Sequence, residues 1–307
     1  MQALCDRVIG PHVRLSCAES AALTRMETQR DRLLWLADTY GDCAHPHPSP
    51  RTPVLMLMRS CASYVRDAFP AVVDAVDRAA REGRIRRPRF YIYENNSGDA
   101  TARELAALAS DRIIVCSDSN RSPGPSGGAR SSGRCRPMAD MRNALRALAL
   151  RDLTACNFCI LLDVDVWFTP HTVVHLLAAV KQNHVDIATP LTLVNECHYF
   201  DTYALVHLHE TPERVLHRRD CFVRGCKQCE LWLASKLDLE ARMPGAVVQG
   251  ILPVRSAFGG LAVVRAQALR GSRRVWASEN DLCEHVALCA GQRTGIVLSA
   301  HARWTQT

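Results

Sequence analysis

The chain has 307 residues, of which 48% are hydrophobic and 22% charged, and its net charge is +7. This composition is typical of a globular protein with a large core and excludes a disordered chain. No run of about 18 apolar residues is present, so we expect no membrane span. Nearly all the positive charge comes from arginines scattered along the sequence, and this scatter argues against nucleic-acid binding.

The cysteines and the first residues indicate a reducing compartment. Most of the 14 cysteines stand singly inside apolar stretches, as buried thiols do, and do not form the pattern of a disulfide framework. The N-terminal sequence lacks the charged start and the apolar core of a secretory signal. We therefore expect a cytoplasmic protein.

Residues 1–51 are predicted to form an N-terminal extension and a linker. The hydrophobic pattern indicates one helix over residues 18–38. A segment rich in proline and histidine follows at residues 45–50, and such segments interrupt regular structure. The remaining residues, 52–307, are expected to form a single domain.

From residue 52 onward, apolar segments typical of strands alternate with amphipathic segments typical of helices. The expected strands are residues 54–58, 89–93, 112–116, 158–166, 186–189, 257–264 and 295–298. The expected helices are residues 64–81, 101–109, 138–150, 170–182 and 279–289. This alternation predicts an α/β fold with a mostly parallel twisted sheet flanked by helices, in which ligands bind at the carboxyl ends of the strands.

The strongest functional signal lies at the end of one expected strand, where Asp163 and Asp165 follow five uncharged residues. In an extended chain, residues two apart face the same side, so these two carboxylates would converge and repel each other. A hard divalent cation such as Mg²⁺ or Mn²⁺ would relieve that repulsion. The alternative is an ordinary acidic turn with both carboxylates in water.

Six segments occur in an order that resembles a GT-A glycosyltransferase with an Asp-x-Asp motif. The resemblance is to the group that contains fungal capsule-associated and Golgi mannosyltransferases and related enzymes of large DNA viruses. It covers residues 52–307, and each segment alone is weak evidence. The segments are YIYENNSGDAT at 91–101, MRNAL at 141–145, LLDVDV at 161–166, YFDTYAL at 199–205, FGGLA at 258–262 and CEHV at 283–286.

The resemblance implies a bound Mn²⁺ or Mg²⁺, which would neutralise the diphosphate of a nucleotide-sugar donor. It implies that Asp165 binds this ion directly, and that Asp163 holds the donor ribose or reaches the ion through water. A histidine after the last strand is a common third ligand in similar enzymes. His301 matches that place, with His285 as the rival, and the alternative for His301 is a surface histidine.

Further residues would bind the donor. The resemblance places Arg142 at the diphosphate or nucleotide, and it places Glu94, Asn96 and Asp99 near the base and ribose. Arg59, after the first strand, would line the same pocket. The sequence 94–99 also favours a turn and a helix cap without any ligand.

The acceptor side is implied by later segments. Glu284 stands where inverting enzymes place the acid that deprotonates the acceptor hydroxyl, and Asp281 is the alternative. Asp201 is a candidate contact to a donor or acceptor sugar. Gly259 and Gly260 would let a sugar approach the backbone, although a bulge without a ligand also explains them.

One segment departs from this pattern. His217, Cys221, Cys226 and Cys229 lie within 13 residues of one another and include a Cys-x2-Cys pair. The spacing does not match a standard zinc site, so free thiols and a structural zinc both remain open.

We conclude from the sequence that the protein is a metal-dependent glycosyltransferase using a UDP- or GDP-sugar and a hydroxyl of a glycan or glycoconjugate. Two alternatives remain. One is an inactive GT-A domain that binds nucleotide sugar or glycan. The other is a nucleotidyltransferase, which usually carries a glycine-rich loop after its first strand, whereas residues 59–63 here contain no glycine. The donor base and sugar, the acceptor, the stereochemistry and the oligomeric state are open.

Overall fold

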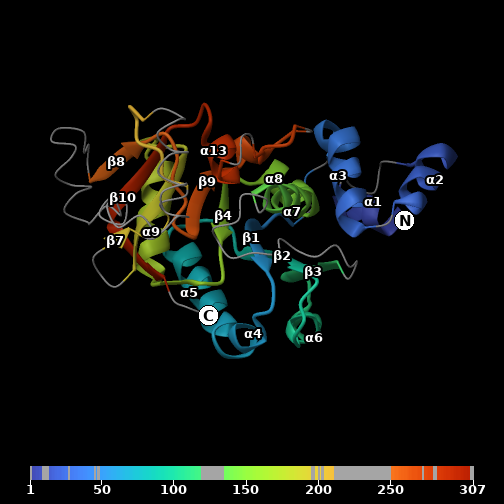
Figure 1. Cartoon of the computed structure of the whole chain (residues 1–307), viewed down its shortest axis with the longest axis horizontal. Coiled ribbons are helices and arrows are strands. Elements are labelled where there is room, and N and C mark those ends of the chain that lie inside the picture. Colours follow the sequence, from blue (N-terminus) through green and yellow to red (C-terminus); the bar gives the residue numbers. More distant parts are fainter. Residues whose placement is uncertain are drawn as a thin grey trace, which may run out of the picture.

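The computed structural model describes residues 2–304 except 9–13, 27, 45, 47–48, 119–134, 195–197, 200, 202–203, 211–249, 272 and 279–281. Its centre is one ten-stranded sheet with the strand order β3-β2-β1-β4-β9-β6-β10-β5, to which β7 adds beside β6 and β8 beside β10 (Figure 1). The strands are β1 (Thr52–Met58), β2 (Pro88–Asn95), β3 (Ile113–Asp118), β4 (Phe158–Leu162), β5 (Val166–Phe168), β6 (Ile187–Val194), β7 (His198–Tyr199), β8 (Ile251–Val254), β9 (Leu261–Arg265) and β10 (Thr294–Trp304).

The sheet is parallel through β3, β2, β1 and β4, and again between β6 and β10. Strand β9 runs antiparallel to both β4 and β6 and joins the two parallel parts. The predicted α/β architecture, a mostly parallel sheet flanked by helices, is therefore confirmed. The elements from β1 to β4 also follow the order that the GT-A resemblance implies.

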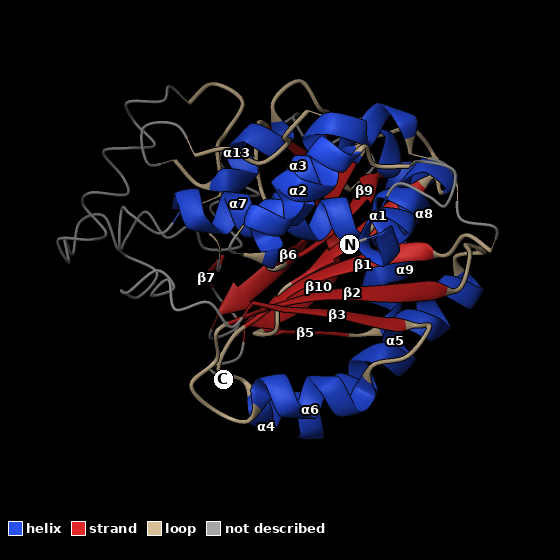
Figure 2. Cartoon of the chain, turned by 90° about the vertical axis from the view of Figure 1, so that its right-hand side faces the viewer, coloured by secondary structure: helices blue, strands red, loops and turns tan. Residues whose placement is uncertain are grey.

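Helices cover both faces of the sheet (Figure 2). One face carries the N-terminal helices with α7, α8 and α13, and the other carries α4, α5, α6 and α9. The helices are α1 (Gln2–Val8), α2 (Cys17–Arg25), α3 (Gln29–Tyr40), α4 (Ala62–Asp67), α5 (Phe69–Glu82), α6 (Thr101–Leu108), α7 (Cys135–Leu148), α8 (Leu150–Ala155), α9 (Pro170–Lys181) and α13 (Glu284–Cys289), with 3-10 turns η1 (Gly41–Cys43) and η3 (Ala266–Leu269).

Strands β1, β2, β3, β4 and β9 alternate between these two cores. On β4, Cys159 and Leu161 pack on the α7 face, whereas Ile160 and Leu162 pack on the α5 and α9 face. This is the two-residue period of a strand buried on both sides. If the alternation is continued past the end of β4, Asp163 falls on the α7 face. The pleat therefore directs this carboxylate toward α7.

Several predicted elements differ from the structure: besides the three described next, the helix expected over 64–81 is divided into α4 and α5, and the strand expected over 257–264 begins at Leu261. The helix expected over residues 18–38 is two helices, because Thr28 begins α3 by accepting the Asp31 N–H. The strand expected over 158–166 ends at Leu162, since a turn carries the chain to β5 beyond β10. The last strand is longer than expected and continues to Trp304.

The N-terminal helices pack on the domain. Leu33 and Leu36 of α3 are fully buried and share one core with Leu145 and Leu148 of α7. Among the described residues, no helix is long and apolar enough to cross a membrane.

A buried polar cluster holds the amino ends of the central strands. The fully buried Asp152 accepts hydrogen bonds from the Arg89 guanidinium (2.8 Å), the Tyr91 hydroxyl (2.9 Å) and the Arg51 backbone N–H (3.2 Å). A buried charge is tolerated only when it is paired in this way, and removing one partner leaves the other uncompensated.

We therefore expect Asp152→Ala to lower the free energy of unfolding by about 3–5 kcal/mol in urea titrations, because it leaves the Arg89 charge buried without its partner. Asp111→Ala is the control: Asp111 pairs with Arg51, but its side chain is 71% exposed. That variant should lose about 1 kcal/mol or less. Equal losses in the two variants would contradict this account of the cluster.

Candidate active site

A buried arginine, Arg142 of α7, lies between two carboxylates at the carboxyl ends of the central strands. Its Nη2 donates to Asp163 Oδ1 over 3.2 Å, and its Nε donates to Glu284 Oε1 over 3.0 Å. The side chains of Arg142 and Glu284 are 5% and 7% exposed, whereas that of Asp163 is 30% exposed. The structure thus brings together three residues that the sequence analysis selected, and it leaves Asp163 accessible from solvent.

Each of the three is held by its own element. Asp163 follows β4, and its backbone N–H donates to Gly260 O over 2.8 Å. Glu284 is the first residue of α13, which packs against α7. Arg142 therefore joins the sheet to α13 through its two ion pairs.

The next residue of α7, Asn143, fixes this helix to the segment before α13. Its side-chain Nδ2 donates to Trp276 O over 2.7 Å, and its Oδ1 accepts the Val275 N–H over 3.0 Å. Arg146, one turn later, donates from Nε to Leu269 O over 2.7 Å. Arg146 is buried, and its guanidinium donates to the backbone carbonyls of Leu269 and Gly271 in place of water.

Burial and neighbouring charges set the protonation of this cluster. Burial raises the pKa of Asp163 to about 6, a net value that includes the lowering effect of Arg142 and the smaller raising effects of the Asp165 and Glu284 charges. Burial alone would lower the pKa of Arg142, but Asp163 and Glu284 raise it above its ordinary value. Arg142 is therefore a permanent cation between acids that would otherwise repel each other.

Asp165 accepts a hydrogen bond from strand β10. The Trp304 indole N–H donates to Asp165 Oδ2 over 3.1 Å. Strand β10 runs antiparallel to β5 with Trp304 opposite Val166 and Ala302 opposite Phe168. This register puts His301 toward the far end of β5 from Asp165. His301 lies within β10, and the structure does not bring it to the two aspartates.

His285, the rival histidine, belongs to an aromatic stack. Its ring lies 3.8 Å from the Phe258 ring, nearly parallel, and the Arg142 guanidinium lies 5.1 Å from the Phe258 centroid. Burial and the Arg142 charge lower the pKa of His285 well below its usual value, so the imidazole is neutral. Neither ring nitrogen has a hydrogen-bond partner among the described residues.

Asp201 holds the backbone on the β9 side of the site. Its carboxylate accepts the Ala204 N–H over 3.1 Å and the Gly259 N–H over 3.2 Å. Burial raises the pKa of Asp201 to about 6, with smaller contributions from the charges of Glu284 and Asp165, whereas the two backbone donors lower it. Asp201 therefore belongs electrostatically to the same acidic cluster.

Gly259 and Gly260 have positive φ angles of 65° and 76°. A Cβ on Gly259 would lie 2.7 Å from Thr192 Oγ1, and one on Gly260 would lie 2.1 Å from Val166 Cγ2. Protein atoms therefore occupy the space where these side chains would be. The need for glycine is explained by the turn and its packing alone.

The acidic turn after β2 is tied to the end of β1. Asp99 accepts the Ala62 N–H over 3.1 Å and the Thr101 N–H over 3.0 Å, and Glu94 accepts the Ser97 N–H over 2.7 Å. The Thr101 hydrogen bond lowers the pKa of Asp99. These contacts are the turn chemistry that the sequence also predicted, whereas the N-cap residue of α6 is Ala100, which makes no side-chain cap.

Asn96 and Arg59 lie in the same two loops. Asn96 adopts a left-handed φ of 45°, and its N–H donates to Asp118 O over 3.1 Å. Arg59 follows β1 directly and is exposed. Both therefore stand at the carboxyl ends of the strands, where the sequence analysis expected a pocket.

Some predicted residues lie outside the described part of the chain, namely Asp281 and the segment with His217, Cys221, Cys226 and Cys229. Within the described residues, no group of three or more His, Cys, Asp or Glu side chains is arranged to hold a metal ion.

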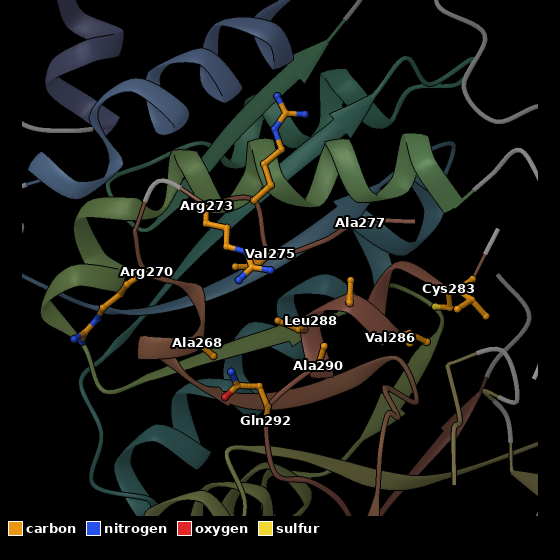
Figure 3. Close-up of a pocket in the computed structure, with 13 residues that line it drawn as sticks. Ala268, Arg270, Arg273, Val275, Ala277, Cys283, Val286, Leu288, Ala290 and Gln292 are labelled. Atoms are coloured by element: carbon orange, nitrogen blue, oxygen red, sulfur yellow. The ribbon is translucent and has the colours of Figure 1, made fainter. Parts of the chain in front are cut away.

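A separate cavity of about 420 Å³ lies between α13 and the segment after η3 (Figure 3). Its described lining contains three arginines. Arg270 donates to Leu153 O and Cys156 O, and Arg274 pairs with Asp38 over 3.0 Å, whereas Arg273 is exposed. Figure 3 shows apolar side chains of α13 on the opposite side of this cavity.

No protein-family model matches the sequence, and no curated protein matches it. Among solved structures, S. aureus TarS 1–349 is similar at 11% identity and a TM-score of 0.43, over 83% of this chain and 60% of that one. The same protein in complex with UDP-GlcNAc is similar at 8% identity and a TM-score of 0.42, over 84% and 59%. GalNAc-T7 with UDP, GalNAc and Mn²⁺ is similar at 11% identity and a TM-score of 0.48, over 85% and 44%.

The chain thus spans 44–60% of the length of these structures. With TM-scores below 0.5, the likeness does not bear on which ligands this chain binds. The functional conclusion rests on the geometry of the residues described above.

The packing of Gly260 gives a test of the turn beside Asp163. We expect Gly260→Ala to lower the free energy of unfolding by about 1–3 kcal/mol or more, because it combines a disfavoured φ with a clash against Val166. Gly250→Ala is a matched control, since Gly250 also has a φ of 76° but nothing lies within 4 Å of its Cβ position. Urea titration should show the smaller loss for Gly250→Ala, and equal losses would exclude the clash.

Asp201 should make stability depend on pH. Its pKa is raised in the folded state, so the folded protein holds this proton more tightly than the unfolded chain between pH 3.8 and about 6. Protonation of Asp201 therefore favours the folded state at low pH, and this contribution to the free energy of unfolding is lost as the pH rises through that window. Unfolding titrations from pH 4 to 7 in metal-free buffer should show wild type losing stability relative to Asp201→Asn. If the difference in the free energy of unfolding between wild type and Asp201→Asn stayed the same from pH 4 to 7, the raised pKa of Asp201 would be contradicted.

Proposed function

We propose that this protein is a metal-dependent glycosyltransferase that moves a sugar from a UDP- or GDP-sugar to a hydroxyl of a glycan or glycoconjugate. The observation that supports this best is the ion-paired cluster of Asp163, Arg142 and Glu284, with Asp165 beside it, at the carboxyl ends of β1 and β4. In this proposal residues 52–307 form a GT-A transferase domain, and residues 1–51 form an extension that packs on it.

The two aspartates suit a hard divalent ion shared with a substrate. Mg²⁺ and Mn²⁺ are commonly held by one or two carboxylates together with substrate phosphates, so a site with two protein ligands is complete only when a diphosphate is present. Asp165 and Asp163 are the residues that would hold the ion. When bound, it would neutralise the charge that develops on the nucleoside diphosphate as it leaves.

Arg142 would contribute by orientation. It is already committed to Asp163 and Glu284, so it fixes the position of one acid on the donor side and one on the acceptor side. Its positive charge also lies close to where a diphosphate would bind, and it would attract that group. Glu94, Asn96, Asp99 and Arg59 are proposed to line the nucleotide end of the pocket.

Glu284 is proposed as the base. In an inverting reaction, one of its carboxylate oxygens would accept the proton of the acceptor hydroxyl as the hydroxyl oxygen attacks the anomeric carbon. Arg142 would hold the carboxylate in place through Oε1. In a retaining reaction the same carboxylate would instead position the acceptor. Asp281 is the alternative base, and Asp201 is proposed as a neighbour of the transferred sugar.

The test measures thermal stability and binding heats with UDP- and GDP-nucleotides, in Mn²⁺ and in EDTA. We expect one nucleotide class to bind wild type only in Mn²⁺, because the ion joins the phosphates to Asp165. Asp165→Ala should lose this metal-dependent binding and remain folded, with only the loss of about 1 kcal/mol expected from the missing Trp304 hydrogen bond. Glu284→Gln should keep donor binding and lose sugar transfer by about a hundredfold or more.

Glu82→Gln, which changes an exposed carboxylate of α5, is the matched control and should behave as wild type. Unchanged nucleotide affinity of Asp165→Ala in Mn²⁺ would contradict the metal assignment. Full turnover by Glu284→Gln would remove Glu284 from the mechanism. Nucleotide binding without any transfer would favour the inactive binding domain.

A further inference from the structure

A second pocket lies on the opposite face of the sheet from α7, between α5 and β5. Its volume is about 300 Å³, at the small end of the range for small-molecule sites. Helix α5 contributes small and apolar side chains such as Val72 and Ala75, and β5 contributes Trp167 and Phe168. The pocket is therefore an apolar groove with an aromatic wall.

Trp167 is unusual for its exposure. Its neighbours Val166 and Phe168 are buried, whereas Trp167 is 59% exposed on the last strand of the sheet. Among the described residues, Leu208 is the other large apolar side chain that is exposed. Burying an indole stabilises a protein, so an indole kept on the rim of a pocket is a feature that a ligand would use.

Tyr64 supplies an unused hydrogen-bonding group at this pocket. It lines the groove and is 8% exposed, yet its buried hydroxyl has no hydrogen-bond partner among the described residues. A buried hydroxyl without a partner costs free energy, and a ligand atom can supply the missing partner. Tyr64 shares a buried core with Val166, the residue after Asp165, and both line the groove.

The rim adds two charged side chains. Asp74 and Arg78 lie one turn apart on α5, both are exposed, and in the described part of the chain neither forms an ion pair. The groove therefore combines an aromatic face with a hydroxyl, a carboxylate and a guanidinium. A hydrocarbon chain would need none of these polar groups, whereas a sugar ring has an apolar C–H face for an indole and hydroxyls at its edge.

We propose that this groove binds a sugar ring of the glycan acceptor, stacked on Trp167. Its link to the acceptor rests on the proposed function, because Trp167 is two residues from Asp165 and because Val166, the neighbour of Asp165, also lines the groove. In this arrangement the groove would hold a sugar unit remote from the reacting hydroxyl. It would supply affinity and select the acceptor without touching the reacting atoms.

The experiment uses the full chain and an array of mannose-, galactose-, glucose- and N-acetylglucosamine-containing oligosaccharides. The strongest glycan is then titrated while indole fluorescence is followed. We expect Trp167→Ala to weaken its binding by about tenfold or more, and Trp167→Phe to retain most of it. Tyr64→Phe should weaken glycan binding without lowering the unfolding midpoint, because the lost hydroxyl has no partner in the protein.

Leu208→Ala is the control, since it removes an exposed apolar side chain outside the groove. The proposal is overturned if wild type binds no glycan, or if Trp167→Ala binds as tightly as wild type. It is also overturned if Trp167→Ala changes the sedimentation coefficient and not glycan affinity, because Trp167 would then lie in a contact between copies.

Nucleotide binding in Mn²⁺, measured on the same proteins, separates the two proposals. If the protein binds glycan through Trp167 but binds no nucleotide, the proposal for the groove is supported and the transferase proposal is rejected. Metal-dependent nucleotide binding that is equal in wild type and Trp167→Ala, with no glycan bound, would reject the groove alone.

Discussion

The position of Arg142 between Asp163 and Glu284 is the interaction on which the acidic site depends. Four carboxylates meet near this point when Asp165 and Asp201 are included, and without a buried cation they would repel one another or take up protons. The cation is itself costly to bury. It is tolerated because both of its charged partners are close and because α7 is fixed to the sheet and to the segment before α13.

The same turn after β4 is approached from both faces of the sheet. On the α7 face it meets Arg142, which orders the acids, and toward the α5 face it leads into Val166 and Trp167, which line the groove together with Tyr64. Strand β4 makes this geometry unavoidable, because its side chains alternate between two buried cores and the chain must leave both of them at Leu162. The turn that follows Leu162 therefore borders both faces of the sheet.

The sequence predicted the alternating elements and the acidic strand ends, because hydrophobic periodicity and turn chemistry are local signals. It also selected Arg142, Asp163 and Glu284 together, although only through a resemblance to known enzymes. The pairing of strands that lie far apart in the sequence could not be predicted in this way. His301 was expected beside the aspartates, but the register of β10 on β5 puts Trp304 beside Asp165, and no local pattern encodes that register. Asn143, which fixes α7, was missed for the same reason.

Strand β10 also has a consequence for the order of folding. It pairs with β6, β8 and β5, and its residue Trp304 contacts Asp165 across 139 positions of sequence. Loop closure over such a distance is slow compared with the pairing of β1 with β2. The strands β1–β4 can thus come together while Asp165 still lacks the indole. During synthesis the acidic turn would be a late-maturing part of the protein, complete only after residues 294–304 have left the ribosome.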